Sequence, residues 1–405
     1  MSGTGSGLLD GVVVLDLTSM ISGPLATMML ADRGAEVIKV ESPAGDYARH
    51  VATRRNGFSA SFVNNNRNKR SIVLDLKKPA ALDALQALIK RADIMVQNFR
   101  PGVATRMGIG PTQAQAINPA LIYLSIAGFG FTGPYSGKPV FDPLIQALSG
   151  LTTIQGGADD ARPRLVRTIL PDKLTAMQAA QAMLAALFAR ERNGGPGRVM
   201  ELSMLDTIVS FLWSSDMGGH TFVGDESSSE AAQSFIDLIY ETVDGYVSIA
   251  VMQDKHWQGF LRALERADLI ADERFATPAL REINKDARTR LIQDLVVGHK
   301  TAALIESLEA HDVPCSPVLT RREMIHHPQI EANRIIGQYQ HPVAGELRQT
   351  RPAPRVIDAP EFSPLGAPAL GEHTREVLLE GGLSAAAVQA LLDEGAAVQA
   401  GQEAA

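Results

Sequence analysis

The stretch Val12-Val13-Val14-Leu15-Asp16-Leu17, together with Leu25 to Arg33 and Glu36 to Glu41, decides the fold. The first and third segments are short apolar runs typical of strands that are buried on both faces, and the second has helical periodicity. Two such strands joined through a helix form a β-α-β unit, and this unit requires a parallel sheet.

The same alternation of strand and helix continues to about residue 200. Further strands are predicted at Ser71 to Leu76, Asp93 to Gln97 and Leu121 to Ile126. The predicted helices are Pro79 to Arg91, Pro111 to Ile117, Phe141 to Gly150 and, after a turn at Gly156-Gly157, the long run Lys173 to Arg192. We therefore predict an α/β fold with a Rossmann-like, doubly wound parallel sheet.

Composition divides the rest of the chain. We predict a large domain at residues 1–215, a Gly- and Ser-rich linker at 216–234, a small α+β domain at 235–323, and a return segment at 324–405 that completes the large domain. A hairpin is predicted around Val243-Asp244-Gly245. Pro and Gly residues between 337 and 368 indicate a long wrapping connection. The small domain should contain helices at Lys255 to Leu264, Asp286 to Val297 and Thr301 to His311; two more helices follow at Thr374 to Glu380 and Ser384 to Leu392, and the last ten residues should be frayed.

Overall composition limits the classes of function. The 405 residues are 45% hydrophobic, which suits a globular protein with a sizeable core, and the net charge is −7 without a long basic block. Nucleic acid is therefore an unexpected partner, and a small molecule is expected. The only cysteine, Cys315, excludes an intrachain disulfide, and no stretch has the roughly 18 apolar residues of a membrane span. We expect a cytoplasmic protein without a signal peptide or membrane anchor.

Asp172 is the best candidate for a catalytic residue. It follows Pro171 at the start of the long helix, where a carboxylate accepts unpaired backbone N–H groups and lies at the positive end of the helix dipole. We expect it to stay ionised at neutral pH, and an ionised carboxylate can act as a nucleophile. The alternative is an ordinary helix cap, because Asp is a preferred cap residue.

Other familiar sites have weaker support. Glu41 ends the second strand, where a dinucleotide-binding protein keeps a ribose-binding acid, but Thr18 to Pro24 contains one glycine where the phosphate turn needs three. His326 and His327 lack metal-ligand spacing, so we predict no metal site. Gly57 to Ser61 lacks the second glycine of a serine nucleophile elbow, and Cys315, between two prolines, favours a structural role.

Two polar segments border predicted strands: the first leads into the strand Ser71 to Leu76, and the second stands at the carboxyl end of the strand Asp93 to Gln97. One is Asn64 to Arg70, and the other is Asn98-Phe99-Arg100-Pro101-Gly102, with Arg106 shortly after it. Asn98 follows a strand directly, and open α/β sheets bind ligands at the carboxyl ends of their strands. Arg and Lys there would suit phosphates and Phe99 a purine. The alternative for each segment is a solvated loop.

Several motifs, in a fixed order, give the chain a resemblance to a known family. They are Leu9 to Asp16, Ser22-Gly23-Pro24, Leu30 to Glu41, Asn66 to Ser71, Asn98 to Gly102 and Arg106-Met107-Gly108. Together they closely resemble the class III CoA-transferases, which include formyl-CoA, carnitine and bile-acid CoA-transferases. The similarity runs from about Leu8 to Trp213 and continues weakly through Asp254 to Trp257 and Asp272 to Thr277.

The resemblance implies an acyl-CoA:carboxylate CoA-transferase with Asp172 as the acylated nucleophile. The substrates would be coenzyme A thioesters and small carboxylic acids, with no permanently bound cofactor and no metal. The family also implies an interlocked homodimer. The residues that it places at the coenzyme A site are Ile21, Ser22, Leu74, Asp75, Lys77, Asn98, Phe99, Arg100, Arg106 and Lys138.

Alternatives remain open. The related α-methylacyl-CoA racemases carry a proton-transferring His in the segment that matches Val140-Phe141-Asp142, and Phe141 cannot move a proton. A non-catalytic coenzyme A-binding homologue would form no acyl-enzyme. The segment near Val247 to Gln253 lacks the glycine run of the formyl-CoA members, so their lid is not expected. Arg49, Arg54 and Arg55 are a weak indication of succinyl-type donors, and a solvated basic loop is the alternative.

Overall fold

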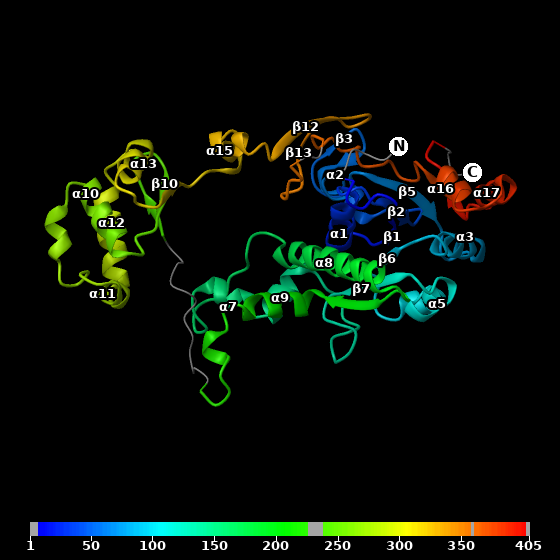
Figure 1. Cartoon of the computed structure of the whole chain (residues 1–405), viewed down its shortest axis with the longest axis horizontal. Helices are drawn as coiled ribbons and strands as arrows, with labels where there is room; N and C mark the ends of the chain where they lie inside the picture. Colours follow the sequence, from blue (N-terminus) through cyan, green and yellow to red (C-terminus); the bar gives the residue numbers. More distant parts are fainter. Residues whose placement is uncertain (1–6, 226–237, 358–359, 402–405) are drawn as a thin grey trace. The chain divides into compact units, whose positions relative to one another are not determined.

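The computed structural model describes residues 7–225, 238–357 and 360–401. The chain forms two compact units, one from residues 1–230 and 334–405 and one from residues 231–333. Figure 1 draws their helices and strands. The domain limits inferred from composition stay predictions.

A seven-stranded sheet lies at the centre of the first unit, in the order β14-β5-β2-β1-β6-β7-β8. All neighbours pair in parallel except β14, which runs antiparallel to β5 at the edge. Counted along the chain, the six parallel strands have the order 3-2-1-4-5-6 of a doubly wound sheet, so the predicted α/β fold is confirmed. The strands are β1 (Val13–Leu17), β2 (Glu36–Glu41), β5 (Lys69–Leu74), β6 (Ile94–Gln97), β7 (Ile122–Ala127), β8 (Val199–Ser203) and β14 (Ala397–Val398).

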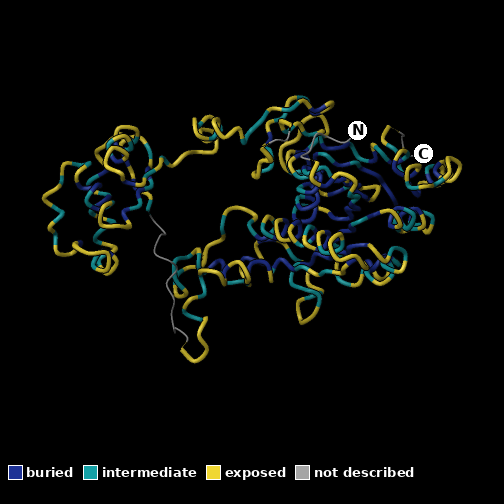
Figure 2. Tube along the Cα trace, viewed as in Figure 1, coloured by how far each residue is buried: buried dark blue, intermediate teal, exposed yellow. Residues whose placement is uncertain are grey.

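Helices cover both faces of this sheet because successive side chains of each strand point to opposite faces. Val14 and Val37 pack with α1 (Ser22–Ala31) and α8 (Leu170–Asn193) on one face. Leu15 and Ile38 pack on the other face with α3 (Pro79–Ile89), α5 (Pro111–Ile117), α16 (Thr374–Glu380) and α17 (Ala385–Asp393). Figure 2 shows the buried residues of this unit concentrated at its centre, with exposed and intermediate residues around them.

Shorter elements complete the first unit. They are η1 (Tyr47–Arg49), β3 (Arg54–Arg55), β4 (Phe58–Ser59), α2 (Ala60–Asn66), α4 (Val103–Arg106), α6 (Asp142–Leu148), α7 (Leu151–Gly156), α9 (Met204–Trp213), η2 (Gly218–His220), β12 (Ile336–His341) and β13 (Gly345–Thr350).

The second unit is a small α+β structure with its own core around Trp257, Phe260 and Phe275. Its three-stranded sheet has the order β11-β10-β9, and the predicted hairpin joins β9 to β10. The elements are β9 (Ile239–Glu241), β10 (Tyr246–Ile249), α10 (Asp254–Ala263), η3 (Ala267–Ala271), α11 (Pro278–Ile283), α12 (Lys285–Val296), α13 (Thr301–Ala310), β11 (Cys315–Pro317), α14 (Arg321–Met324) and α15 (Pro328–Ala332).

Two sequence-based expectations are wrong. The predicted wrapping connection contains the hairpin of β12 and β13, whose half-buried polar residues hide the usual alternation. The predicted frayed end contains β14, where Ala397 pairs with Leu74, although residues 402–405 lie outside the described part. A polar hairpin in the first place, and pairing with a distant strand in the second, supply order that the local sequence does not indicate. The predicted linker at 216–234 is described only as far as residue 225.

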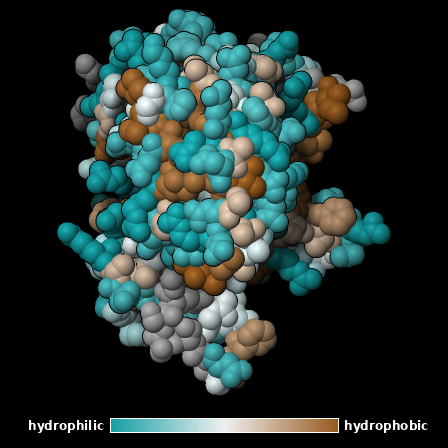
Figure 3. Space-filling model, turned by 90° about the vertical axis from the view of Figure 1, so that its left-hand side faces the viewer, coloured by the Kyte–Doolittle hydropathy of each residue, from teal (hydrophilic) through white to brown (hydrophobic). Residues whose placement is uncertain are grey.

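On the face that Figure 3 presents, hydrophobic side chains lie in separate groups among hydrophilic ones. In the part of the chain that the structure describes, every helix is too short or too polar to span a bilayer.

Candidate active site

Helix α8 brings Asp172 to the carboxyl edge of the sheet. Near the other end of α8, Arg190 donates to Asp93 at 2.7 Å and to the carbonyl of Ala120 at 3.1 Å, just before β6 and β7 begin. The C-terminal end of α8 is thereby fixed at the amino edge of the sheet. Its first turn must lie at the opposite edge, where doubly wound sheets bind ligands.

The alternative that Asp172 is an ordinary helix cap does not hold, because Asp172 is not the cap residue of α8. The cap position belongs to Ile169, and Asp172 is the third helical residue, within the first turn of the helix. Pro171 occupies the second position, where its missing N–H costs no hydrogen bond. The half-buried Asp172 side chain is therefore free to face neighbouring elements instead of its own helix end.

Two neighbours set the electrostatics of Asp172. Ser22, the first residue of α1, lies close enough for its hydroxyl and its backbone N–H to stabilise the charged carboxylate of Asp172. Asp142, the first residue of α6, accepts the backbone N–H of Asp172 at 3.3 Å. Three helix N-termini thus meet at one carboxylate, and α1 and α8 lie side by side in Figure 1.

The pKa of Asp172 reflects these neighbours. Burial, together with the negative charge of Asp142, raises the pKa of Asp172 to about 6, while the hydrogen bonds from Ser22 oppose the rise. Helix-terminus stabilisation alone would lower this pKa, but burial and the charge of Asp142 outweigh it. The expectation that Asp172 is ionised at neutral pH still holds, because a carboxyl group with a pKa near 6 is mostly ionised at pH 7.

Asp142 is itself held firmly in place. Its carboxylate accepts from Gln146 at 2.6 Å, and Gln146 also accepts the N–H of Val166 at 2.9 Å in the segment that leads into α8. Burial raises the pKa of Asp142, although Gln146 and the N–H of Asp172 lower it. The neighbouring Phe141 is exposed and caps α6, so the position of the racemase histidine lies directly beside this carboxylate pair.

The turn after β1 joins this site to the end of β6. Asn98 donates to the carbonyl of Ser19 at 2.9 Å and accepts the N–H of Ser19 at 3.0 Å. Strands β1 and β6 are neighbours at the point where the strand order reverses. Ile21, Ser22 and Asn98, which the family resemblance placed at the coenzyme A site, therefore lie along the same part of the carboxyl edge of the sheet.

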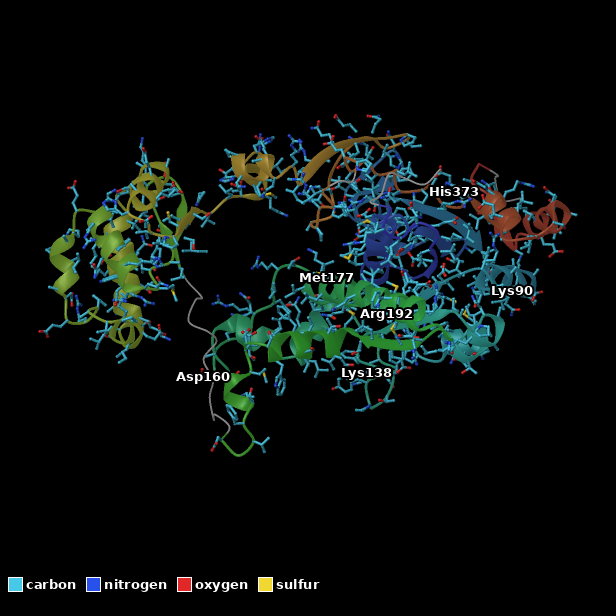
Figure 4. All side chains as sticks on the ribbon, viewed as in Figure 1. Lys90, Lys138, Asp160, Met177, Arg192 and His373 are labelled. Atoms are coloured by element: carbon cyan, nitrogen blue, oxygen red, sulfur yellow. The ribbon has the colours of Figure 1, made fainter. Side chains whose placement is uncertain are left out.

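The predicted basic residues lie on exposed segments after the strands. Lys77 follows β5, Arg100 follows β6, and Arg106 ends α4, all with exposed side chains. Lys138 lies on the loop that follows β7, as Figure 4 shows, with its ammonium 3.2 Å from the ring centre of Tyr135. The carboxyl ends of β5, β6 and β7 thus carry the positive charge that a phosphate-rich ligand would need.

The other three residues predicted at the coenzyme A site differ in how far they are exposed. Asp75 is half-buried, with one carboxylate oxygen accepting the N–H of Lys77 at 3.2 Å. Phe99 is half-buried and packs against the sheet core, which leaves part of its ring accessible. Leu74 is 1% exposed and paired with Ala397 in β14, so its side chain faces the core and only its backbone remains a candidate for contact with coenzyme A.

Arg49 is not available for a substrate carboxylate. It is buried, and its guanidinium binds Glu41 through two hydrogen bonds of 2.8 and 2.7 Å. Arg55 donates to the carbonyl of Glu346, and Arg54 is exposed beside it. The same contacts occupy Glu41, which removes it as a ribose-binding acid. Among the described residues there is no cluster of three potential metal ligands.

Sequence reasoning overlooked a set of buried charged side chains near the turn between β1 and α1. Asp16, Lys39, Asp46 and Lys69 are each at most 4% exposed. A signal was present, because Asp16 and Lys39 interrupt otherwise apolar strands, and charged residues are rarely buried unless paired.

Comparison with known proteins shows similarity over nearly the whole chain. Residues 9–374 match the family described as CoA-transferase family III. The chain is 35% identical to succinyl-CoA:mesaconate CoA-transferase of Haloarcula hispanica over 93% of this chain and 97% of that protein. It is 31% identical to succinyl-CoA:glutarate CoA-transferase of Mus musculus, over 92% and 86% of the two chains. A CAIB/BAIF family protein from Brucella suis has a similar crystal structure, with a TM-score of 0.80, 28% identity and coverage of 92% and 98%.

Proposed function

The chain belongs to CoA-transferase family III and is an enzyme that transfers CoA, and from that premise we propose that it moves CoA from succinyl-CoA to a small dicarboxylic acid through Asp172. One observation carries the proposal. The Asp172 carboxylate lies at the carboxyl edge of the sheet, where Ser22 stabilises its charged form and the nearby charge of Asp142 disfavours it, and its pKa is raised to about 6. Such a group is ionised at neutral pH yet more basic than an ordinary carboxylate, which favours nucleophilic attack.

The reaction conserves thioester energy in two covalent intermediates. An oxygen of Asp172 attacks the thioester carbonyl, the C–S bond breaks, and a mixed anhydride and CoA thiolate form. The thiolate then attacks the aspartyl carbon of the anhydride, which releases the donor acid and leaves an aspartyl-CoA thioester. The acceptor acid repeats both steps in reverse, so Asp172 is regenerated. Partial burial of Asp172 supports this route, because water would hydrolyse either intermediate.

The substrate class is proposed from the relatives and from charge. Mesaconate and glutarate, named for two similar enzymes, are both dicarboxylic acids, and succinyl-CoA is the named donor of each. With Arg49 paired to Glu41, exposed Arg54 is the remaining candidate from the basic segment for a distal carboxylate. The exposed cations Lys77, Arg100, Arg106 and Lys138 are proposed to bind the phosphates of coenzyme A.

The decisive experiment is intact-protein mass spectrometry after mixing with succinyl-CoA, followed by hydroxylamine and peptide mapping. We expect a hydroxylamine-sensitive adduct on the peptide that carries Asp172, and no adduct in Asp172→Ala. The matched control is Asp206→Ala, because Asp206 is also the third residue of its helix, α9, but is exposed. This control should keep the adduct.

A panel of donors separates the alternatives. Succinyl-CoA should form adduct faster than butyryl-CoA, which has the same chain length without the distal carboxylate, and Arg54→Met should reduce that preference. Equal rates with both donors would contradict the dicarboxylate assignment. Exchange of an α-proton without any adduct would indicate a racemase, and coenzyme A binding without either reaction would indicate a non-catalytic homologue.

A further inference from the structure

The turn between β1 and α1, residues Thr18 to Met20, is held in an uncommon conformation. Met20 has a φ of +69°, in the left-handed region that residues other than glycine rarely adopt. This turn leads through Ile21 to Ser22, whose hydroxyl and backbone N–H stabilise the charged form of Asp172. Because the local backbone disfavours this conformation, contacts from elsewhere must maintain it.

Most backbone N–H and C=O groups of this turn form hydrogen bonds with side chains from other elements. Thr18 donates its N–H to Asp16 at 2.9 Å, and its carbonyl accepts from Lys39 at 2.8 Å. Both backbone groups of Ser19 bind Asn98, and Met20 donates its N–H to Asp46 at 3.0 Å. The shape of the turn therefore depends on side chains from β1, β2, the segment before η1 and the end of β6.

Lys39 and Asp46 connect these contacts to one another. Their charged groups form an ion pair of 2.9 Å with side chains 0% and 1% exposed. Asp46 also accepts the N–H of Ala48 at 2.9 Å, which anchors it at the start of η1. Burial alone would lower the pKa of Lys39, but Asp16, Asp46 and Glu41 outweigh it and raise the pKa, so the ammonium stays charged.

A buried ion pair is a poor device for stability alone, because desolvation offsets most of the attraction between its charges. It can instead specify one arrangement among several. We propose that Lys39 and Asp46 are positioning residues for the transfer reaction: they fix the turn Thr18 to Met20 so that Ser22 meets the carboxylate of Asp172. This inference rests on the proposed function of Asp172.

The test follows the pH dependence of adduct formation, which stability alone would not move. Lys39→Met removes the charge and keeps a similar length. If the turn relaxes, Ser22 no longer stabilises the ionised carboxylate, so the midpoint of the acid limb rises by at least half a pH unit. We also expect the single-turnover rate of adduct formation at pH 7 to fall tenfold or more.

The matched control is Arg67→Met. Arg67 pairs with Asp32 at 2.6 Å, both side chains are at most 5% exposed, and neither residue binds the turn. This control should lose a comparable amount of stability while the midpoint stays in place. An equal shift in both variants, or an unmoved midpoint and rate in folded Lys39→Met, overturns the inference.

Asp46→Asn is the second variant if Lys39→Met does not fold. Its amide oxygen can still accept the Met20 N–H, but the amide has no negative charge to hold Lys39 against Thr18. We expect the midpoint to rise here as well, and an unchanged profile contradicts the inference. The wild-type protein separates the two proposals: without an Asp172 adduct the proposed function fails and the inference falls with it, whereas a wild-type adduct with unshifted variants overturns the inference alone.

Discussion

The surroundings of Asp172 disfavour the charged form of its carboxyl group. Burial and the nearby carboxylate of Asp142 both favour the neutral acid, and only Ser22 opposes them. The resulting pKa lies between that of an ordinary aspartate and the working pH. A nucleophile benefits from this compromise, since a more basic carboxylate attacks a thioester faster as long as it remains ionised.

The first prediction concerns the pH dependence of adduct formation. Because the ionised form of Asp172 must attack, the rate should fall as pH decreases through about 6, with the slope of a single proton. Asp142→Asn removes the like charge, lowers the pKa of Asp172 and should move this acid limb to lower pH. Rapid-quench measurements between pH 4.5 and 8 give the midpoint; a midpoint that stays at 6 in Asp142→Asn would show that Asp142 does not act through its charge.

The second prediction concerns stability. The pKa of Asp172 rises on folding, so the folded state holds its proton more tightly than the unfolded state, and ionisation destabilises the fold as pH rises from about 4 to 6. Asp172→Asn should therefore increase the free energy of unfolding by about 1 to 3 kcal/mol at pH 7 and add nothing from this source below about pH 4.

Urea unfolding at both pH values checks this expectation, with exposed Asp206→Asn as the control that changes little at either pH. A loss of stability in Asp172→Asn at pH 7 would mean that the Asp172 carboxylate supports the fold instead of burdening it.

At the scale of the element, the first turn of α1 requires a glycine. Gly23 is the second residue of α1, and a Cβ placed on it would lie 2.3 Å from the Cβ of Thr18. Thr18 is buried and hydrogen-bonded to Asp16, so it cannot move aside easily. The motif Ser22-Gly23-Pro24 thus allows the turn to fold closely over the helix that presents Ser22.

The third prediction is that Gly23→Ala separates Ser22 from Asp172. The added methyl group must displace Thr18, so we expect a loss of about 1 to 3 kcal/mol in the free energy of unfolding and a strong reduction in adduct formation. Gly298→Ala is the control, because no atom lies within 4 Å of the Cβ it would gain. Thermal unfolding and the single-turnover assay measure both effects, and full activity in Gly23→Ala would refute the close-packing argument.

At the scale of the whole molecule, the first unit leaves many large apolar side chains exposed around α6, α8 and α9. They are Leu144, Leu148, Phe188, Val209, Phe211 and Trp213, each between 37% and 65% exposed. Exposed apolar surface of this kind marks interaction sites. It supports the homodimer that the family resemblance implies, which stays a proposal.

The fourth prediction is that this surface joins two copies of the chain. Phe211→Asp should weaken self-association, because a charge buried in an apolar interface has no partner. Sedimentation velocity at several concentrations measures the effect, with Leu379→Asp on α16 as a control of similar exposure. A wild-type chain that sediments as a monomer at all concentrations would contradict the proposal.

The sequence predicted most of the sheet because its strands are locally distinct. The apolar runs at β1, β2 and β6 stand between helices of clear periodicity, so pattern alone locates them. It missed β8 at the edge of the sheet, whose residues are mostly exposed or half-buried. It also failed for β12, β13 and β14, where order comes from a polar hairpin or from pairing with a distant strand. The same limit applies to Arg49, whose pairing with Glu41 no local pattern indicates.

By itself the sequence determined the fold class, the family resemblance and the candidate nucleophile Asp172, because hydrophobic periodicity and motif order are local properties of the chain. Only the tertiary structure decided the surroundings of that carboxylate. Asp142 and Ser22 lie 30 and 150 residues from Asp172, and their meeting depends on how α1, α6 and α8 pack at the sheet edge. Charge interactions depend on distance and burial, so the direction of the Asp172 pKa shift could be read only after the chain was folded.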